Sequence, residues 1–424
     1  MNVLVIGGGG REHTLCWKLK QSPKCEHLFA APGNAGTASC ATNLPIGVND
    51  FEGIKKAVIE HAIQLVIVGP EEPLVNGIHD FFLNDPTLAK VGVIGPQKLA
   101  ATLEGSKSFA KDFMLRHNIP TAAYAEFNAK NIEEGEAFLT NSKPPYVLKA
   151  DGLAAGKGVL IIEDLEEAKK ELRQMLLESK FGAASSKVVI EEFLEGIELS
   201  CFVLTDGSSY ITLPMAKDYK RIGEGDTGLN TGGMGAISPV PFVTEAFKEK
   251  IDTQIIKPTI EGLQKDGLPF KGFLFIGLIK VGEEPKVIEY NVRLGDPETE
   301  VVLPRIKNDL LTIFMAVHEE KLNEISLEIN PSFAATVVAV SGGYPEAYEK
   351  GKLILGIEKI QDSIVFHAGT TIKNNKIVTN GGRVLAITSM DLDYKKALKK
   401  SYRNIEKLNF DAMNYRKDIG YDLT

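Results

Sequence analysis

The segment from Val287 to Glu300 reads VIEYNVRLGDPETE and holds the residue types that a metal-assisted phosphoryl transfer needs. On a strand, Glu289, Asn291 and Arg293 would share one face, because side chains alternate. A carboxylate beside an amide oxygen is an all-oxygen donor set that suits Mg²⁺ or Mn²⁺, with phosphate oxygens completing the shell. Arg293 can bind a carboxylate through two parallel hydrogen bonds. A cross-strand salt bridge is the alternative interpretation of this segment.

A second segment, KADGLAAGKGV, runs from Lys149 to Val159 between two predicted strands. A glycine loop in that position can fold over phosphates, and Lys149 and Lys157 would bring positive charge to the phosphate oxygens. The loop is not a Walker motif, because its glycine spacing is one residue short and Gly158 replaces the Ser or Thr that would hold magnesium. A hairpin with solvated lysines is the alternative.

The glycine run GGGGREH, residues 7–13, follows a predicted strand and opens a predicted helix, where backbone N–H groups can hold an anion. Arg11 beside this loop suits a phosphate. The GxGxxG frame of dinucleotide folds fails, because Glu12 or His13 stands where the third glycine belongs. The second strand also ends without an acidic residue for a ribose. An NAD-dependent oxidoreductase is therefore disfavoured, and a tight turn with a surface arginine is the structural alternative.

Two further segments suit a nucleotide site less specifically. In VVIEEFLEGIELS, residues 188–200, a short extended stretch could offer backbone groups to a base, and Glu198 could bind ribose hydroxyls. A solvated acidic loop is the more frequent structure for such a segment. Residues 215–241 contain KDYKR and NTGGMGA, and that density of glycine suits a close approach to a ligand or a closing lid. The alternative is a plain mobile loop.

The elements that would position these residues fall into three parts. The first hundred residues hold short apolar runs bounded by Gly and Pro with helices between, which predicts a parallel sheet covered on both faces. Ligands of such sheets bind beyond the carboxyl ends of the strands. From about residue 102, strands and glycine loops dominate, including an antiparallel pair at 271–281 and 285–292. From Ser332 short strands recur, and a lysine-rich helix is predicted at 391–408.

The composition sets broad limits on function. The chain has 424 residues, 48 basic and 56 acidic, which gives a net charge of −8 and argues against a whole-chain attraction to nucleic acid or an anionic membrane. Its length suggests two to four domains. No apolar run is long enough for a membrane span. The four cysteines form no CxxC pair, which favours a reducing cytosol.

Seven motifs together resemble those of the phosphoribosylamine–glycine ligase family of the ATP-grasp superfamily. They occur in family order over essentially the whole chain: GGGGREH at 7–13, APGNAGT at 31–37, VGPEEPL at 68–74, KADGLAAGKGV at 149–159, EEFLEG at 191–196, NTGGMGA at 230–236 and GDPETE at 295–300. The resemblance implies α/β and α+β architecture in several domains. It implies an N-terminal Rossmann-like domain at 1–103, an ATP-grasp domain at 104–330 with a mobile lid subdomain at 120–192, and a C-terminal strand-rich domain at 331–424.

The resemblance also implies a reaction of de novo purine synthesis. ATP, glycine and 5-phosphoribosylamine would give ADP, phosphate and glycinamide ribonucleotide through glycyl phosphate, with Mg²⁺ or Mn²⁺ as cofactor. The enzyme would be cytoplasmic, would act on small molecules without nucleic acid or membrane partners, and would be a monomer. Glycyl phosphate hydrolyses readily, so the loop around Lys157 and residues 215–241 would close the site against water.

The site residues carried over from the family fall into four groups. The expected ATP contacts are Lys107, Lys149, Lys157, Glu191, Glu192, Phe193, Leu194 and Glu198. The expected metal ligands are Glu289 and Asn291. The expected ribose-phosphate contacts are Gly9, Gly10, Arg11, Glu12, Asn34, Gly36, Thr37, Glu71, Glu72 and Pro73. The expected reaction-centre and amino-acid contacts are Lys157, Asp218, Lys220, Arg293 and Asp296.

Three positions depart from the family pattern. Tyr219 stands where the family often has His, Ile197 replaces a frequent acidic residue before Glu198, and Leu294 stands where Phe is common. None of these changes removes a group that the chemistry needs. Two other functions stay open: an ATP-grasp ligase for a different amino acid or bicarbonate, and a non-catalytic nucleotide sensor that kept the fold.

Overall fold

A five-stranded parallel sheet forms the N-terminal part of the chain in the computed structural model, which describes residues 1–153 and 158–423. The parallel sheet is as the apolar runs predict, and its strand order is β3-β2-β1-β4-β5. The strands are β1 (Asn2–Gly7), β2 (His27–Pro32), β3 (Thr42–Asn43), β4 (Leu65–Val68) and β5 (Gly92–Ile94). The helices are α1 (Gly10–Leu19), α2 (Phe51–Glu60), α3 (Glu71–Val75), α4 (Ile78–Asn84) and α5 (Lys98–Gly105). Val3 and Val5 pack into one hydrophobic core and Leu4 and Ile6 into another, so both faces of the sheet are buried.

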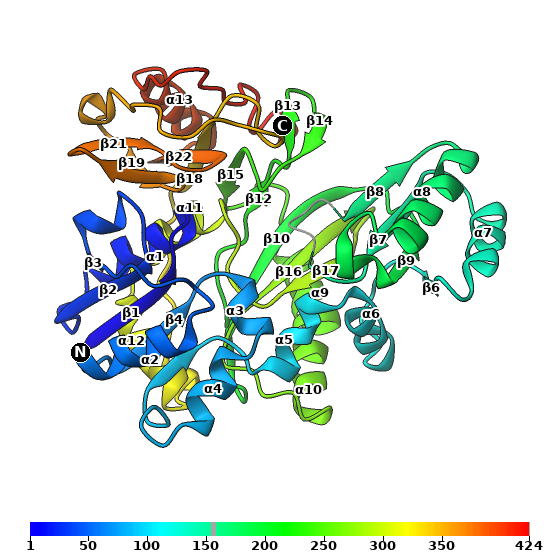
Figure 1. The fold of residues 1–424 in the computed structure, drawn as a ribbon, viewed down its shortest axis with the longest axis horizontal. Coiled ribbons are helices and arrows are strands. Elements are labelled where there is room, and N and C mark those ends of the chain that lie inside the picture. The colour runs from blue at the N-terminus through cyan, green and yellow to red at the C-terminus, as the bar shows by residue number, and fades with distance from the viewer. Residues whose placement is uncertain (154–157, 424) are drawn as a thin grey trace.

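A small antiparallel sheet projects from the rest of the molecule, at the right of Figure 1. Its strand order is β6-β9-β7-β8, and it has a hydrophobic core of its own. The strands are β6 (Tyr124–Asn128), β7 (Tyr146–Ala150), β8 (Val159–Ile162) and β9 (Lys187–Glu191), and the helices are α7 (Ile132–Asn141) and α8 (Leu165–Glu178). Helix α6 (Lys107–Arg116) precedes this unit, and the Ser106 side chain caps it by accepting the N–H of Phe109.

The central sheet is antiparallel, with the order β11-β10-β16-β17. Its strands are β10 (Ile197–Thr205), β11 (Tyr210–Thr212), β16 (Gly272–Val281) and β17 (Glu284–Asn291). The predicted antiparallel pair is confirmed: Glu289 lies opposite Gly277 and Asn291 opposite Phe275, with a bulge beside Gly277. The single helix predicted over 244–263 is instead α9 (Glu245–Ile251), a π-helical segment (Asp252–Ile256) and α10 (Lys257–Lys265).

The prediction of one long loop over 215–241 is wrong. The segment forms β12 (Lys217–Asp218), β13 (Arg221–Gly223), β14 (Thr227–Asn230) and β15 (Gly235–Ser238). Strands β12 and β15 join the C-terminal sheet, whose order is β12-β15-β18-β22-β19. Residues 235–238 are buried against β18, which supplies the apolar neighbours that so short a strand needs. Sequence patterning misses such strands because their stabilisation comes from distant residues.

The C-terminal sheet is antiparallel and is covered by α13 (Tyr394–Ile405), shorter than the predicted helix. Its remaining strands are β18 (Phe333–Val340), β19 (Ile364–His367) and β22 (Arg383–Asp391), with a separate hairpin β20 (Thr370–Lys373) and β21 (Lys376–Thr379). Helices α11 (Thr299–Val302) and α12 (Leu310–His318) lead into this part. Over the described residues, none of the helices combines the length and apolar character that crossing a bilayer requires.

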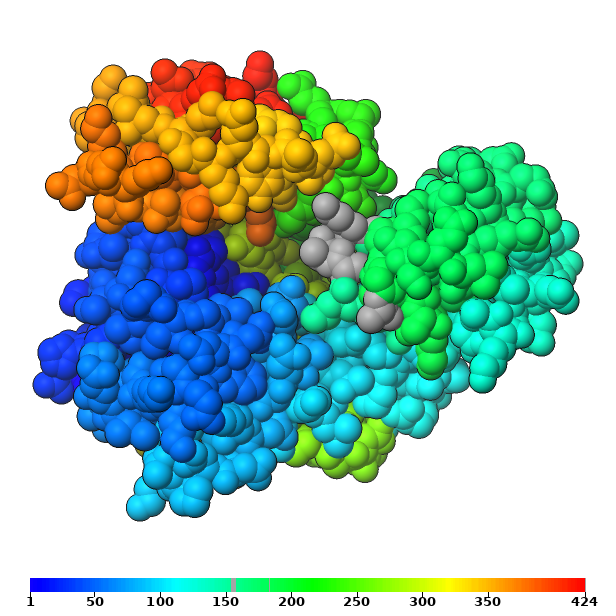
Figure 2. Space-filling model, in the orientation of Figure 1, coloured from blue at the N-terminus to red at the C-terminus, as the bar shows by residue number. Residues whose placement is uncertain are grey.

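A hollow opens where the three parts meet (Figure 2). It lies between the blue N-terminal residues, the yellow and orange C-terminal residues and the green residues at the right. The carboxyl ends of β1, β2 and β4 and the end of β17 lead toward this region in Figure 1. The fold therefore gathers loops from distant parts of the sequence around one opening.

Candidate active site

Arg293, just beyond β17, links the central sheet to the N-terminal part. Its Nη2 lies 2.8 Å from Oε1 of Glu104 and donates to Oδ1 of Asn291 at 3.1 Å. Its Nε lies 3.3 Å from Oε2 of Glu71. Glu104 also accepts the N–H of Val292 at 2.7 Å. The arginine therefore holds α3 and α5 against the end of the strand that carries the two predicted metal ligands.

The two carboxylates around Arg293 differ in their affinity for protons. Burial raises the pKa of Glu104 to about 7, although Arg293 acts in the opposite direction. Burial would also raise the pKa of Glu71, but Arg293 and Arg11 outweigh it and lower that pKa. Glu71 is thus the firmly ionised partner, and Glu104 exchanges its proton near neutral pH.

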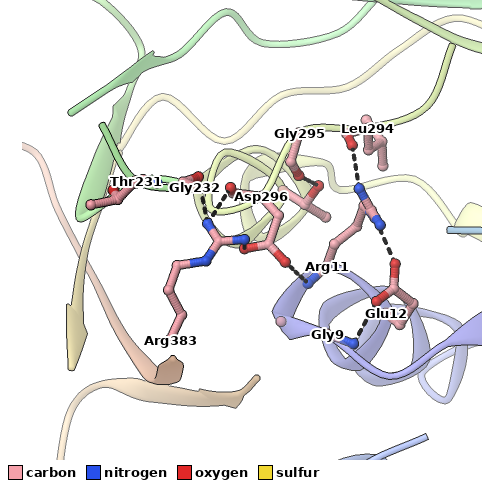
Figure 3. Close-up of polar contacts among 12 residues, drawn as sticks. Gly9, Arg11, Glu12, Thr231, Gly232, Leu294, Gly295, Asp296 and Arg383 are labelled. Carbon is pink, nitrogen blue, oxygen red and sulfur yellow. Dashed lines mark hydrogen bonds and ion pairs between the residues drawn. The ribbon is translucent and has the colours of Figure 1, made fainter. Parts of the chain in front are cut away.

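Asp296 joins three distant parts of the chain (Figure 3). Nη2 of Arg383, from β22, lies 3.1 Å from its Oδ1, and the backbone N–H of Arg11 donates to its Oδ2 at 3.2 Å. Arg383 also donates to the carbonyl of Gly232 at 2.6 Å. Burial opposes ionisation of Asp296, but Arg383 and Arg11 lower its pKa. The C-terminal sheet, the loop before β15 and helix α1 therefore meet on one ionised carboxylate.

The residues assigned by sequence to the ribose phosphate follow strands of the parallel sheet. They come after β1, β2 and β4 and are Gly9, Gly10, Arg11, Glu12, Asn34, Gly36, Thr37, Glu71, Glu72 and Pro73. These three strands are neighbours, and the carboxyl ends of parallel strands meet at one edge of a sheet. The structure brings the whole group together at the hollow.

The start of α1 is already engaged by carboxylates of the chain itself. Oε2 of Glu12 accepts the N–H of Gly9 at 2.6 Å, and Oε1 pairs with Nε of Arg11 at 2.6 Å. Nη1 of Arg11 donates to the carbonyl of Leu294 at 3.0 Å. Arg11 is thus a buried brace between α1 and the turn after β17, and a phosphate would have to exchange with these partners to bind its side chain.

Asn34 fixes the shape of the neighbouring loop. Its side-chain amide donates to the carbonyls of Gly8 at 3.0 Å and His367 at 2.7 Å, and its Oδ1 accepts the N–H groups of Gly36 and Thr37 at 2.8 and 2.9 Å. A Cβ on Gly36 would lie 2.6 Å from the Cβ of His367, so only glycine fits without a shift. The Asn34 side chain is already used in bonds within the protein. The backbone groups of this loop are therefore the ones that can face a ligand.

Two lysines converge on one carboxylate oxygen among the residues that the sequence assigns to ATP. Nζ of Lys149 and Nζ of Lys111 lie 2.9 and 3.0 Å from Oε2 of Glu191, and all three side chains are buried. Burial lowers the pKa of Lys111 to about 8, against the pull of Glu191. The other oxygen, Oε1, is buried and has no hydrogen-bond partner among the described residues. Such an acceptor is costly unless a ligand donates to it.

Lys107 lies beside these lysines at the start of α6. Its Nζ donates to the carbonyl of Gly152 at 3.3 Å. Burial lowers its pKa, while Glu289 raises it. Glu192, Phe193 and Leu194 follow β9 as an irregular segment in which Phe193 is partly exposed. Lys157, assigned to the same site, lies outside the described residues.

A narrow pocket brings Glu198, Asp218, Lys220 and Glu289 together. Nζ of Lys220 lies 2.7 Å from Oε2 of Glu198. Although burial opposes it, Glu198 and Asp218 raise the pKa of Lys220, so this ammonium stays charged. Burial raises the pKa of Asp218. Glu298 accepts from Ser200 at 3.0 Å, and burial together with Asp218 raises its pKa to about 7.

The predicted metal ligands fit a cation that also binds phosphate. Within residues 1–153 and 158–423 there is no group of three His, Cys, Asp or Glu side chains arranged for a metal. Glu289 lines the acidic pocket, and Oδ1 of Asn291 accepts one bond from Arg293, which leaves it a second lone pair. Two protein oxygens suit Mg²⁺ when phosphate oxygens and water supply the others.

Four site residues were missed by sequence reasoning. Lys111 lies one helical turn beyond Lys107, and that i, i+4 spacing on a basic helix was an available signal. Glu104, Glu298 and Arg383 reach the site through tertiary contacts. Arg383 lies 87 residues from Asp296 in the sequence, and nothing in the local pattern marks it.

Three family models match the chain in succession. They are described as the N domain, the ATP-grasp (A) domain and the C domain of phosphoribosylglycinamide synthetase, and they match residues 1–104, 105–299 and 334–422. The chain belongs to the phosphoribosylglycinamide synthetase family.

Two phosphoribosylamine–glycine ligases match the chain over nearly the whole length of both proteins. The phosphoribosylamine–glycine ligase of Vibrio vulnificus strain YJ016 is 46% identical over 426 residues, which cover 99% of this chain and 98% of that one. A solved structure of the phosphoribosylamine–glycine ligase of Thermotoga maritima matches with a TM-score of 0.85 at 36% identity, over 99% of this chain and 100% of that one. A bifunctional purine biosynthetic protein of Pichia angusta is 47% identical over 428 residues. The match covers 99% of this chain but only 54% of the length of the Pichia protein.

Replacement of Glu104 by Gln should change how stability depends on pH. The folded state binds the proton of Glu104 up to about pH 7, whereas the unfolded chain releases it near 4.5. The unfolding free energy of the native protein should therefore fall, relative to Glu104→Gln, as the pH rises from 4.5 to 7. Chemical denaturation at several pH values measures this difference. Glu60→Gln, at an exposed position, should show no such trend, and a flat difference for Glu104→Gln would contradict the assignment.

Proposed function

We propose that the chain joins glycine to 5-phosphoribosylamine through glycyl phosphate, with release of glycinamide ribonucleotide, ADP and phosphate. Family membership supports an ATP-dependent carboxylate–amine ligase of purine biosynthesis. The observation that carries the site assignment is the orphaned Oε1 of Glu191 beside two buried lysines, next to an acidic pocket that contains Glu289. The buried acceptor suits a donor group of the base, and the lysines suit the phosphates. The carboxylates of the pocket suit a metal cation.

In this proposal the nucleotide lies along β7, β9 and β17. Oε1 of Glu191 accepts a hydrogen bond from the adenine amine, which supplies its missing donor. Glu192, Phe193 and Leu194 border the base, and Glu198 binds the ribose hydroxyls. Lys107, Lys149 and Lys157 neutralise phosphate oxygens, the main demand of phosphoryl transfer. Support comes from the burial of Lys149 against Glu191 and from the half-buried Lys107, whose pKa Glu289 acts to raise.

Glu289 and Asn291 would hold Mg²⁺ or Mn²⁺. When bound, the cation neutralises charge on the phosphoryl group during transfer. Arg293 keeps Asn291 oriented through its 3.1 Å hydrogen bond, and Lys220 balances the negative charge of Glu198 and Asp218 at the other side of the pocket. The carboxylate of Glu289, the other expected metal ligand on β17, lines the same pocket as Lys220.

The chemical reason for an acyl phosphate is that a carboxylate is a poor electrophile. The glycine carboxylate oxygen attacks the γ-phosphorus and ADP leaves, which gives glycyl phosphate. The amine of phosphoribosylamine then attacks the carbonyl carbon, inorganic phosphate leaves, and the amine loses a proton. Asp218, Lys220, Arg293 and Asp296 would line this reaction centre, with Arg293 orienting the glycine carboxylate by exchanging one of its present partners.

The sugar phosphate would bind at the carboxyl edge of the parallel sheet, over Gly9 to Glu12, Asn34 to Thr37 and Glu71 to Pro73. Support comes from the position of these loops, which follow the neighbouring strands β1, β2 and β4 at one edge of the sheet. We further propose a division at 1–103, 104–330 and 331–424, with 120–192 as the mobile lid. The separate hydrophobic core of the projecting sheet supports this lid.

The proposal includes only small-molecule partners, a monomeric state and a cytoplasmic location. The net charge of −8 supports the first point, because it gives no general attraction to nucleic acid. The four cysteines are unpaired in the structure, which supports a reducing compartment.

ADP release should require all four of ATP, Mg²⁺, glycine and freshly formed phosphoribosylamine. The assay omits one component at a time and follows ADP in a coupled system. Release without glycine, or only with another amino acid or bicarbonate, would overturn the substrate assignment and keep the ATP-grasp ligase. ATP binding without release would indicate a sensor.

Replacement of Glu289 by Gln should raise the Mg²⁺ concentration at half-maximal rate by about tenfold or more, because a charged ligand is lost. A titration of the rate with Mg²⁺ at saturating ATP measures the change. Glu284→Gln is the matched control, since Glu284 lies on the same strand but is exposed and pairs with Lys250. An unchanged titration for Glu289→Gln would place the metal ligands elsewhere.

A further inference from the structure

Tyr219, the position where the family pattern often has His, is buried against the C-terminal end of the described chain. Its side chain is 1% exposed, and its hydroxyl donates to Oδ1 of Asp422 at 2.8 Å. Nζ of Lys217 pairs with Oδ2 of the same carboxylate at 3.1 Å. Burial and the charge of Asp422 raise the pKa of Tyr219, so the hydroxyl keeps the proton that it donates. One carboxylate thus fastens two residues of the segment that begins with β12.

Two cations flank the Tyr219 ring. Nζ of Lys217 lies 4.9 Å from its centroid and the guanidinium carbon of Arg416 5.3 Å from it. The Arg416 side chain is fully buried and pairs with Asp226 at 2.5 Å and with Asp418 at 2.6 Å. A buried guanidinium needs such partners to offset its desolvation. Arg416 therefore ties the C-terminal segment, residues 416–422, to the β13–β14 hairpin.

Further bonds join the same two parts. Oδ2 of Asp418 accepts the N–H of Gly225 at 2.7 Å, and the hydroxyl of Tyr421 donates to Oδ2 of Asp226 at 2.9 Å. Figure 1 shows the C-terminus beside β13 and β14. The hairpin that follows Lys220 is thus held from one side by the C-terminal segment.

Alternation along the extended chain links this contact to the pocket. Lys217 and Tyr219 point toward the C-terminal segment, whereas Asp218 and Lys220 line the pocket with Glu198 and Glu289. The backbone of Tyr219 is bonded in both directions: its N–H donates to the carbonyl of Gly235 at 3.0 Å, and its carbonyl accepts the N–H of Met234 at 2.7 Å. The side chains on the outer face add the contacts with the C-terminal segment.

We propose that the C-terminal segment positions Asp218 and Lys220 in the reaction centre, and that Tyr219 is the positioning residue through which it acts. The inference rests on the proposed function, because it assigns Asp218 and Lys220 to that centre. The inference gives Tyr219 a role: its hydroxyl binds Asp422, and its ring lies against two cationic side chains. The segment does not touch the substrates in this account.

The test compares Tyr219→Phe and Asp422→Asn with Tyr394→Phe as the control. Tyr394 donates to the carbonyl of Leu423 at 3.0 Å, directly after the C-terminal segment, so its variant also loses one hydrogen bond to the end of the described chain. Tyr219→Phe and Asp422→Asn should lower kcat about tenfold or more, as expected for a small misplacement of reacting groups. In a Lys220→Ala background, Tyr219→Phe should cause a smaller further loss than in the wild-type background, because the part of its effect that passes through Lys220 is already gone.

Equal losses from Tyr219→Phe in both backgrounds, or kcat values like those of Tyr394→Phe, would overturn the inference. Hydrogen exchange of residues 217–223 gives a readout that does not depend on turnover. It should be faster in Tyr219→Phe and Asp422→Asn than in Tyr394→Phe, and equal rates would also overturn the positioning role. Wild-type protein without ligase activity would contradict the proposed function alone, and the exchange comparison would still decide the inference.

Discussion

The neutralisation of buried charge in the turn after β17 is the constraint on which the rest of the site depends. Asp296 and the two carboxylates around Arg293 come together where three parts of the chain meet. Without cations beside them, the desolvation of these carboxylates would destabilise the fold. Arg11 and Arg293 come from the N-terminal and central parts, and Arg383 comes from the C-terminal sheet. Each arginine bonds across a boundary between sheets. The interactions that stabilise the buried charges therefore also hold the sheets in position around the hollow.

The buried charge of Glu191 is neutralised in a second cluster, by lysines instead of arginines. Around Glu191, two ammonium groups share one oxygen, and the other oxygen has no donor in the part of the chain that the structure describes. In the first cluster each carboxylate faces an arginine of the chain, which suits it to holding parts together, although Nε of Arg293 makes no hydrogen bond to the described residues. The second is incomplete and is suited to binding, because a ligand that donates a hydrogen bond removes the cost of the orphaned acceptor. The narrow acidic pocket contains Lys220 together with the carboxyl groups of Glu198, Asp218 and Glu289, and the phosphates and the cation would meet there.

The sequence predicted what local patterns encode. Four of the five strands of the parallel sheet, the β16–β17 pair and the family were predicted because apolar runs and motif spacing are local properties, and the structure and the comparisons confirm them. The two-residue strand β3 was missed. Sequence alone missed the strands within 215–241, whose burial comes from β18, and Arg383, whose partner is remote in the chain. It assigned Arg11 to a phosphate, whereas the structure shows the guanidinium bonded to Glu12 and Leu294. The assigned roles of the individual site residues stay predictions.

The central claim is that glycine is activated as an acyl phosphate in this site. The most direct measurement uses glycine labelled with ¹⁸O in both carboxylate oxygens and follows the phosphate released by mass spectrometry. If glycyl phosphate forms, one carboxylate oxygen leaves with the γ-phosphoryl group, so each phosphate released should carry one ¹⁸O from glycine. Phosphate without the label, formed at the same rate as glycinamide ribonucleotide, would contradict the account.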